Sequence, residues 1–204
     1  MVSSPLDYVA LGDSYTIGTS VSEGERWPNQ LVARLAGGRT GGLRLVANLG
    51  VNGFTSEDVV RVELPRLRSL ALHFATVLVG VNDVVRRVPS DRFRVNATVI
   101  LDSLLETLVP KRIVIVSTPD YTVTPQGASY GDPATQSEGI RRNNAILRQL
   151  AGDRSVAFVD IFDISQAAAT DRSLVASDGL HPSGRQYTQW VDRIAPVVED
   201  LLIG

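Results

Sequence analysis

The sequence predicts an α/β protein with three layers, in which an open parallel sheet of about five strands lies between two layers of helices. Short apolar runs suited to buried strands alternate along the chain with longer segments of helical periodicity. Strands that alternate with helices form parallel sheets, because each helix returns the chain to the edge where the previous strand began. The length of 204 residues, with 44% hydrophobic and 21% charged residues, is sufficient for one sizeable core. We therefore expect one domain that spans residues 1–204.

The strands and helices are expected in strict alternation. Apolar runs predict strands, in chain order, at residues 8–11, 43–48, 75–79, 112–117 and 156–161. Apolar residues that recur with the helical period predict helices at residues 27–35, 56–70, 91–108, 137–150 and 183–202. Each predicted strand is thus followed by a predicted helix.

Residues at the helix boundaries support these limits. Pro28 lies near the start of the first predicted helix, and the pair Gly37–Gly38 follows its end. Ser56 begins the second helix, and Ser90 with Asp91 begins the third. Residues of these types cap helix N-termini and complement the positive end of the helix dipole.

The composition argues against several classes of function. The net charge of −2 provides no electrostatic attraction to nucleic acid or to an anionic membrane surface. Because the chain has no cysteine, it has no disulfides, no thiolate catalysis and no cysteine-ligated zinc. No apolar run approaches the ~18 residues that a membrane span needs.

The sequence says little about the cellular location and the oligomeric state of the protein. The first seven residues lack the basic segment and the apolar run of a signal peptide, so we expect a cytoplasmic protein. Secretion stays open if the N-terminus is trimmed. No amphipathic stretch is left without a place in the core, and the sequence therefore indicates no oligomeric state.

Polar residues and glycines follow the first three predicted strands where each strand ends. Ser14 follows the first strand, a loop with two glycines (residues 48–55) follows the second, and residues 80–83 follow the third. In open parallel sheets, ligands bind beyond the carboxyl ends of the strands. We therefore expect these segments to meet at one edge of the sheet, as an active site requires.

A serine, a histidine and an aspartate far apart in the chain are the ingredients of acyl transfer by a nucleophilic hydroxyl. Ser14 lies where an apolar strand reaches a glycine, and Asp178 and His181 lie three residues apart before the last helix. The chain has only two histidines, and histidine is the usual base near neutral pH. His73, in an apolar run between a helix and a strand, is expected to be structural.

Taken singly, each segment also has a purely structural interpretation. Gly12, Asp13 and Ser14 are of types that are common in turns. The glycines of residues 48–55 fit a tight turn with positive φ, or a backbone N–H that approaches a ligand. Asn82 or Asp83 can cap the next helix, or the Asn82 amide can donate to a developing oxyanion.

Together, the segments resemble the SGNH subgroup of the GDSL esterase/lipase family, which is named for a serine, a glycine, an asparagine and a histidine in four blocks. The blocks are Gly12-Asp13-Ser14, then Gly53, then Asn82, then Asp178 with His181. They occur in the family's order and span nearly the whole chain. Tyr15 stands where the family's first block has leucine, which bears on the pocket more than on the mechanism. The resemblance implies a flavodoxin-like three-layer fold with about five parallel strands.

The resemblance also implies roles for these residues. Ser14 is the expected nucleophile, His181 the base, and Asp178 the residue that orients the imidazole. The backbone N–H groups of Ser14 and Gly53 and the side chain of Asn82 are the expected oxyanion donors. No metal and no cofactor are expected, and the partner is a small-molecule ester. Among family activities, carbohydrate O-deacetylase, lysophospholipase and thioesterase remain alternatives.

The loops around the expected site favour short acyl esters. Residues 118–136, with Tyr121 and Tyr130, and residues 18–26 are expected to flank the pocket. Their small and polar side chains do not suggest a deep apolar channel.

Other classes of function use the same residues differently. A metal-dependent phosphoesterase would take its ligands from Asp13, Asn82, Asp83, Asp178 and His181, although such sites usually use more histidines. A flavin- or nucleotide-binding module is a second alternative, but residues 50–53 are no dinucleotide fingerprint and no P-loop occurs. A non-catalytic ligand-binding domain on the same fold is a third.

Overall fold

The computed structural model describes residues 4–38 and 41–203, and the beginning of the segment inspected for a signal peptide, residues 1–3, lies outside this part. Its centre is a sheet of parallel strands in the order β2-β1-β3-β4-β5. The strands are β1 (Leu6–Gly12), β2 (Leu43–Asn48), β3 (Phe74–Leu78), β4 (Ile113–Val116) and β5 (Ala157–Val159). The predicted parallel five-stranded sheet is confirmed.

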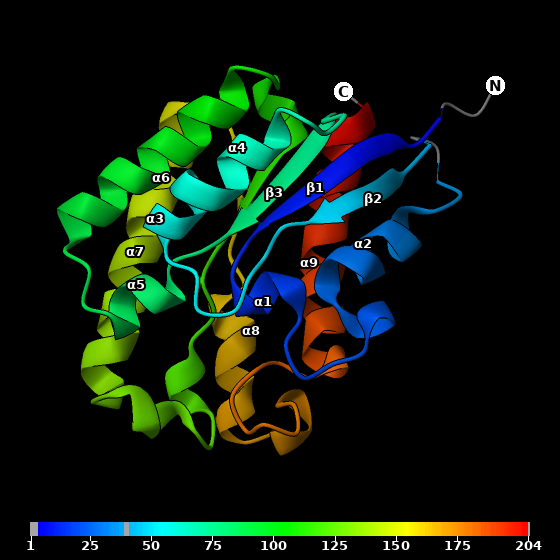
Figure 1. Ribbon diagram of the computed structural model, residues 1–204. Helices are drawn as coiled ribbons and strands as arrows, with labels where there is room; N and C mark the ends of the chain where they lie inside the picture. Colours follow the sequence, from blue (N-terminus) through cyan, green and yellow to red (C-terminus); the bar gives the residue numbers. More distant parts are fainter. Residues whose placement is uncertain (1–3, 39–40, 204) are drawn as a thin grey trace.

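Helices connect the strands (Figure 1). The α-helices of the described residues are α1 (Ser14–Ile17), α2 (Trp27–Leu35), α3 (Ser56–Asp58), α4 (Leu64–Leu67), α5 (Val81–Val85), α6 (Ser90–Leu105), α7 (Pro133–Asp153), α8 (Phe162–Gln166) and α9 (Gly184–Ile203). No helix in residues 4–38 or 41–203 is long and apolar enough to cross a membrane.

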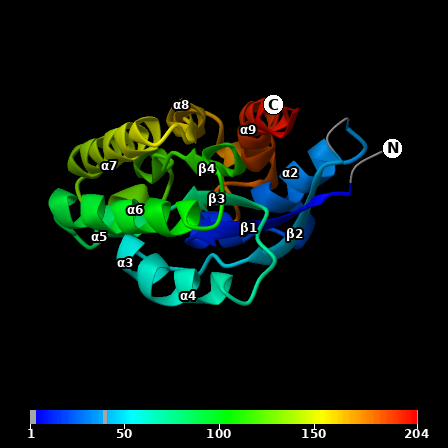
Figure 2. The ribbon, with the colours of Figure 1, turned by 90° about the horizontal axis from the view of Figure 1, so that it is seen from above.

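The helices cover both faces of the sheet and form the predicted three layers (Figure 2). Successive residues of a strand point to opposite faces. In β1, Tyr8 and Ala10 pack with α2 and α9, whereas Val9 and Leu11 pack with α6 and α7. The indole rings of Trp27 and Trp190 are fully buried on the face of the sheet that α2 and α9 cover.

The long helix predicted at residues 56–70 is wrong in its detail. α3 ends after one turn, a π-helical turn follows at Val59–Glu63, and α4 begins at Leu64. The Leu64 N–H donates to the Val59 carbonyl, five residues back, instead of to the residue four back. Pro65 accounts for the break, because proline has no N–H for the next α-helical bond.

The helix predicted at residues 27–35 matches α2 at both ends, whereas the other predicted helices have shifted ends and the short helices after the strands were not predicted. α7 begins four residues earlier than expected because Asp132 caps it and Pro133 occupies the first turn. α6 ends at Leu105, three residues before the predicted limit. α1, α5 and α8 are too short to show helical periodicity in the sequence.

The strand order reverses its direction at β1. β2 follows β1 in the chain and lies on one side of it, whereas β3 and all later strands lie on the other. Open α/β sheets bind ligands at such a switch point, beyond the carboxyl ends of the strands. Here it brings the residues after β1 close to those after β3.

Candidate active site

Ser14 lies at the point where β1 gives way to α1. Gly12 ends the strand with φ +148°, and a Cβ there would lie 2.1 Å from the Leu78 carbonyl oxygen of β3, so only glycine fits. Asp13 caps α1, since its Oδ1 accepts a hydrogen bond from the Tyr15 N–H at 3.0 Å. This turn presents the Ser14 hydroxyl at the edge of the sheet.

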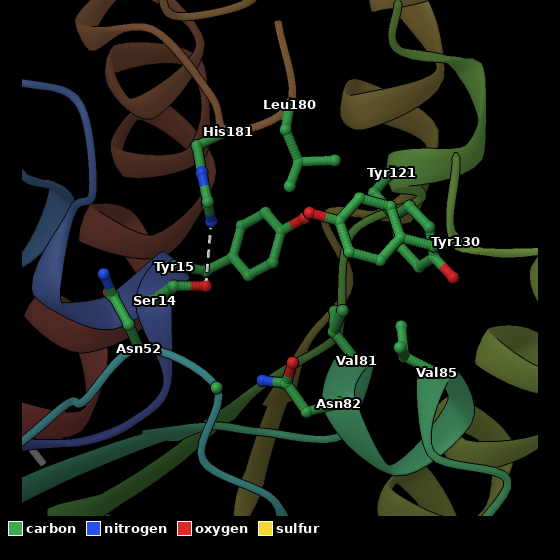
Figure 3. Close-up of a pocket in the computed structure, with 11 residues that line it drawn as sticks. Ser14, Tyr15, Asn52, Val81, Asn82, Val85, Tyr121, Tyr130, Leu180 and His181 are labelled. Carbon is green, nitrogen blue, oxygen red and sulfur yellow. Dashed lines mark hydrogen bonds between the residues drawn. The ribbon is translucent and has the colours of Figure 1, made fainter. Parts of the chain in front are cut away.

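The loop before α9 brings Asp178 and His181 to Ser14. His181 Nε2 lies 2.9 Å from Ser14 Oγ (Figure 3). His181 Nδ1 lies 2.6 Å from Asp178 Oδ2. Asp178 Oδ1 accepts hydrogen bonds from the backbone N–H groups of Leu180 and His181. The three residues expected to act together are therefore in one hydrogen-bonded chain.

The Asp178 carboxylate is held in its charged form. Its partial burial alone would raise its pKa, but hydrogen bonds from His181, from Ser20 and from two backbone N–H groups lower the pKa to about 2. Ser20 Oγ donates to Asp178 Oδ2 at 2.7 Å. Ser20 has φ +66°, which is uncommon outside glycine, and sequence reasoning did not identify it as a site residue.

The expected oxyanion donors lie on two neighbouring loops. Gly53 has φ +80°, and its carbonyl accepts a hydrogen bond from Arg86 Nη2 at 2.7 Å, which fixes the orientation of the loop. Asn82, at the start of α5, donates one amide hydrogen to the Phe54 carbonyl at 2.9 Å. This bond fixes the amide and leaves its second hydrogen available to a ligand.

These groups line a cavity of about 230 Å³. Its lining consists of the polar residues just described and of tyrosine and aliphatic side chains: Ser14, Tyr15, Asn52, Gly53, Val81, Asn82, Val85, Tyr121, Tyr130, Leu180 and His181. Residues 118–136 flank the cavity through two tyrosines, as expected. Residues 18–26 add no lining residue within the described chain. Instead, Thr19 donates to Asn52 Oδ1 at 2.5 Å, and Ser20 contacts Asp178.

Of the five residues of the metal-site alternative, Asp178 and His181 bond to each other, and Asp13, Asn82 and Asp83 are engaged elsewhere. Asp13 caps α1, and Asp83 is buried and accepts hydrogen bonds from the N–H and hydroxyl groups of Ser56 at 2.9 and 2.5 Å. In residues 4–38 and 41–203, no three His, Asp or Glu side chains are grouped as metal ligands would be. His73 lies just before β3, at the opposite end of the strands from Ser14. Its Nδ1 is 3.7 Å from Asp7 Oδ2.

A buried glutamate lies behind the turn that carries Ser14. Glu63, the last residue of the π-helical turn, is fully buried, and its Oε2 accepts a hydrogen bond from the Gly12 N–H at 3.0 Å. Burial raises the pKa of the Glu63 carboxyl to about 9, against the lowering effect of that bond, and the nearby Asp13 adds to the rise. Burial likewise raises the pKa of Asp13 to about 8.

Replacing Glu63 with glutamine is expected to stabilise the protein at alkaline pH. An unfolded glutamate loses its proton near pH ~4.3, so the stability from the neutral Glu63 is complete below that pH and is lost as pH rises towards 9. Glutamine stays neutral at every pH. The free energy of unfolding of Glu63→Gln should therefore exceed that of wild type by on the order of 3 kcal/mol at pH 8 and by little at pH 4.5. Urea denaturation across this range measures the difference. Glu199→Gln, on the exposed face of α9, is the control, and parallel pH curves for wild type and Glu63→Gln would contradict the prediction.

Comparison with known proteins identifies a matching family. Residues 10–189 match the model of the GDSL-like lipase/acylhydrolase family. A comparison with curated protein sequences finds no match.

Similar solved structures share the fold at low sequence identity. A member of the lipolytic protein G-D-S-L family from Veillonella parvula is 15% identical, with a TM-score of 0.74 over 95% of this chain and 98% of that one. An α/β hydrolase enzyme from the metagenome of Lake Arreo is 19% identical, with a TM-score of 0.76 over 98% and 99% of the two chains. An acetylxylan esterase from Geobacillus stearothermophilus is 19% identical, with a TM-score of 0.69 over 98% and 95%. These likenesses confirm the three-layer α/β/α fold.

Proposed function

Because the chain belongs to the GDSL-like lipase/acylhydrolase family, we propose that it hydrolyses compact carboxylic esters through an acyl-enzyme formed on Ser14. The observation that carries the proposal is the hydrogen-bonded chain from Ser14 Oγ through His181 to Asp178, at 2.9 and 2.6 Å, beside a cavity. A hydroxyl next to an oriented imidazole is the arrangement that activates a serine nucleophile.

In the proposed reaction, Ser14 Oγ attacks the ester carbonyl while His181 Nε2 accepts the hydroxyl proton. His181 then returns this proton to the departing alcohol, and the acyl group stays on Ser14. Water attacks the acyl-enzyme with the same proton transfers and releases the acid. The ionised Asp178 keeps the Nδ1 proton in place and stabilises the imidazolium that forms in each step.

The proposed oxyanion site consists of the Ser14 and Gly53 N–H groups and the free amide hydrogen of Asn82. The bonds from Asn82 to the Phe54 carbonyl and from Arg86 to the Gly53 carbonyl hold these donors before substrate binds. Donors that are already oriented stabilise the developing charge without the cost of reorganisation.

The size of the cavity supports short substrates. The cavity of about 230 Å³ is small and is lined by bulky tyrosine and aliphatic side chains, which suits a short acyl group. A long acyl chain would extend into solvent. The acetylxylan esterase among the similar structures acts, by its name, on acetyl groups, which supports carbohydrate O-deacetylation as the second candidate.

Hydrolysis of p-nitrophenyl esters from acetate to palmitate, with a chelator present, tests the proposal. We expect the highest kcat/KM between acetate and butyrate and a steep decline for longer chains. Absence of hydrolysis by folded protein would contradict the proposed function. Activity that disappears with the chelator would favour the metal-dependent alternative.

Asn82→Ala is expected to lower kcat by about 10²–10³ with little change in thermal stability, because one oriented donor to the oxyanion is lost. Rate measurements with p-nitrophenyl acetate, together with thermal unfolding, check both parts. The matched control is Asn144→Ala, which also removes an asparagine amide, but a buried one that is bonded to the Thr118 backbone and does not line the cavity. The effect of Asn144→Ala should fall on stability more than on kcat. Turnover near the wild-type value in Asn82→Ala would remove this residue from the mechanism.

A further inference from the structure

One polar group in the cavity has no role in the proposed mechanism. The Tyr15 side chain is only 3% exposed and lines the cavity, and its ring centroid lies 5.2 Å from that of His181. In Figure 3 the ring extends from the side of Ser14 towards Tyr121. Within the described part of the chain, the Tyr15 hydroxyl has no hydrogen-bond partner.

Tyr121, Asn82 and Asn52 of the cavity are already engaged, whereas Tyr130, whose hydroxyl also has no partner in the described chain, is 43% exposed. Tyr121 donates its hydroxyl hydrogen to Gln136 Oε1 at 2.7 Å, and Asn82 donates to Phe54. Asn52 Oδ1 accepts a hydrogen bond from Thr19. The Tyr15 hydroxyl thus differs from these neighbours, because the protein orients it without giving it a partner.

Burial keeps this hydroxyl neutral. Loss of solvent, reinforced by the nearby charge of Asp13, raises the pKa of Tyr15 well above its ordinary value. A neutral phenol both donates and accepts a hydrogen bond. Because Tyr15 lines the cavity, a ligand there with a matching group can become the hydrogen-bond partner of this hydroxyl.

We propose that Tyr15 is a specificity-determining residue, which selects short esters that carry a hydroxyl group, or a carbonyl group besides that of the ester, inside the cavity over purely aliphatic esters. The proposal rests on the proposed esterase function. Val81, Val85 and Leu180 make the rest of this wall apolar, so a substrate group without hydrogen-bonding capacity would leave the Tyr15 hydroxyl unpaired. Sites built to bind a substrate hydroxyl discriminate strongly against analogues that lack it.

Two matched pairs of esters test the proposal and separate the two parts of the substrate. Ethyl butyrate and ethyl 3-hydroxybutyrate differ by one hydroxyl on the acyl side, and propyl acetate and 3-hydroxypropyl acetate differ by one on the alcohol side. The readout is the ratio of kcat/KM within each pair, measured in a pH-stat. Tyr15→Phe removes only the hydroxyl. Tyr121→Phe is the matched control, because the hydroxyl that it removes is already bonded to Gln136.

We expect wild type to prefer the hydroxylated ester at least tenfold in one pair. The ratio should fall to about one in Tyr15→Phe and persist in Tyr121→Phe. No preference in either pair, or a preference that survives in Tyr15→Phe, would overturn the proposal.

Binding separates this proposal from the proposed function. Calorimetry with Ser14→Ala measures the Kd of the same esters, with and without Tyr15→Phe in addition. A preference for the hydroxylated ester that depends on Tyr15 supports the proposal even if wild type hydrolyses no ester, in which case only the proposed function fails. Equal Kd values within both pairs would overturn the role of Tyr15.

Discussion

Ser14→Ala is expected to lower kcat/KM for p-nitrophenyl acetate by about 10⁴-fold or more, because it removes the proposed nucleophile. The Ser14 hydroxyl lies 2.9 Å from His181 Nε2, and its attack begins the proposed reaction. The remaining oxyanion donors would still bind the ester, so the loss should appear in kcat rather than in KM.

The measurement needs a control for folding and for contaminating esterases. Ser69→Ala, at an exposed serine that donates only to the Arg66 carbonyl, should behave as wild type. A p-nitrophenyl phosphonate should add to wild type and to Ser69→Ala, detected as a mass increase, but not to Ser14→Ala. Residual activity of Ser14→Ala above one-hundredth of wild type would contradict the assignment.

Much of the fold was predictable because its signals are local. Buried parallel strands are short apolar runs, and their alternation with helices leads to a parallel sheet. The convergence of residues after β1, β2 and β3 follows from the same topology, since parallel strands end at one edge. Ser14 and Asn82 therefore could be assigned to one edge of the sheet before their distance was known, whereas His181 was joined to them by the family resemblance.

The parts that were missed depend on contacts between distant segments. Ser20 donates a hydrogen bond to Asp178, which is 158 residues away in the sequence. The positive φ of Ser20 has no signature in the sequence. Glu63 reads as an ordinary polar residue of a helix, whereas the π-helical turn buries it against Gly12. The free hydroxyl of Tyr15 becomes visible only when its neighbours are known to be engaged.

Two buried carboxyl groups lie near the turn that carries Ser14, although acidic residues are usually exposed. Glu63 and Asp13 each have one buried oxygen without a partner among the described residues. Such groups reduce stability at neutral pH, and functional sites commonly contain them. The Gly12 turn is thus held by a carboxyl group whose burial opposes its ionisation.

His181→Ala is expected to lower kcat as much as Ser14→Ala does. Asp178→Asn is also expected to lower kcat, but its loss should be smaller than that of His181→Ala by a factor of roughly 10 to 100. Without His181 no group accepts the Ser14 proton. In Asp178→Asn, the Oδ1 contacts with the Leu180 and His181 N–H groups can remain, so the loop keeps its shape. The loss comes from the missing charge beside the imidazole and from an amide that favours the wrong tautomer.

The pH dependence provides a second test of the same pair. Because the pKa of Asp178 is lowered to about 2, its charge contributes stability above the unfolded value of about 3.9, and this contribution is lost only as pH falls towards 2. We therefore expect wild type to become less stable between pH 4 and pH 2 by an increment that Asp178→Asn lacks, as measured by urea denaturation. If Asp178→Asn loses more activity than His181→Ala, or if both proteins lose stability in parallel below pH 4, Asp178 is not the charged partner of His181.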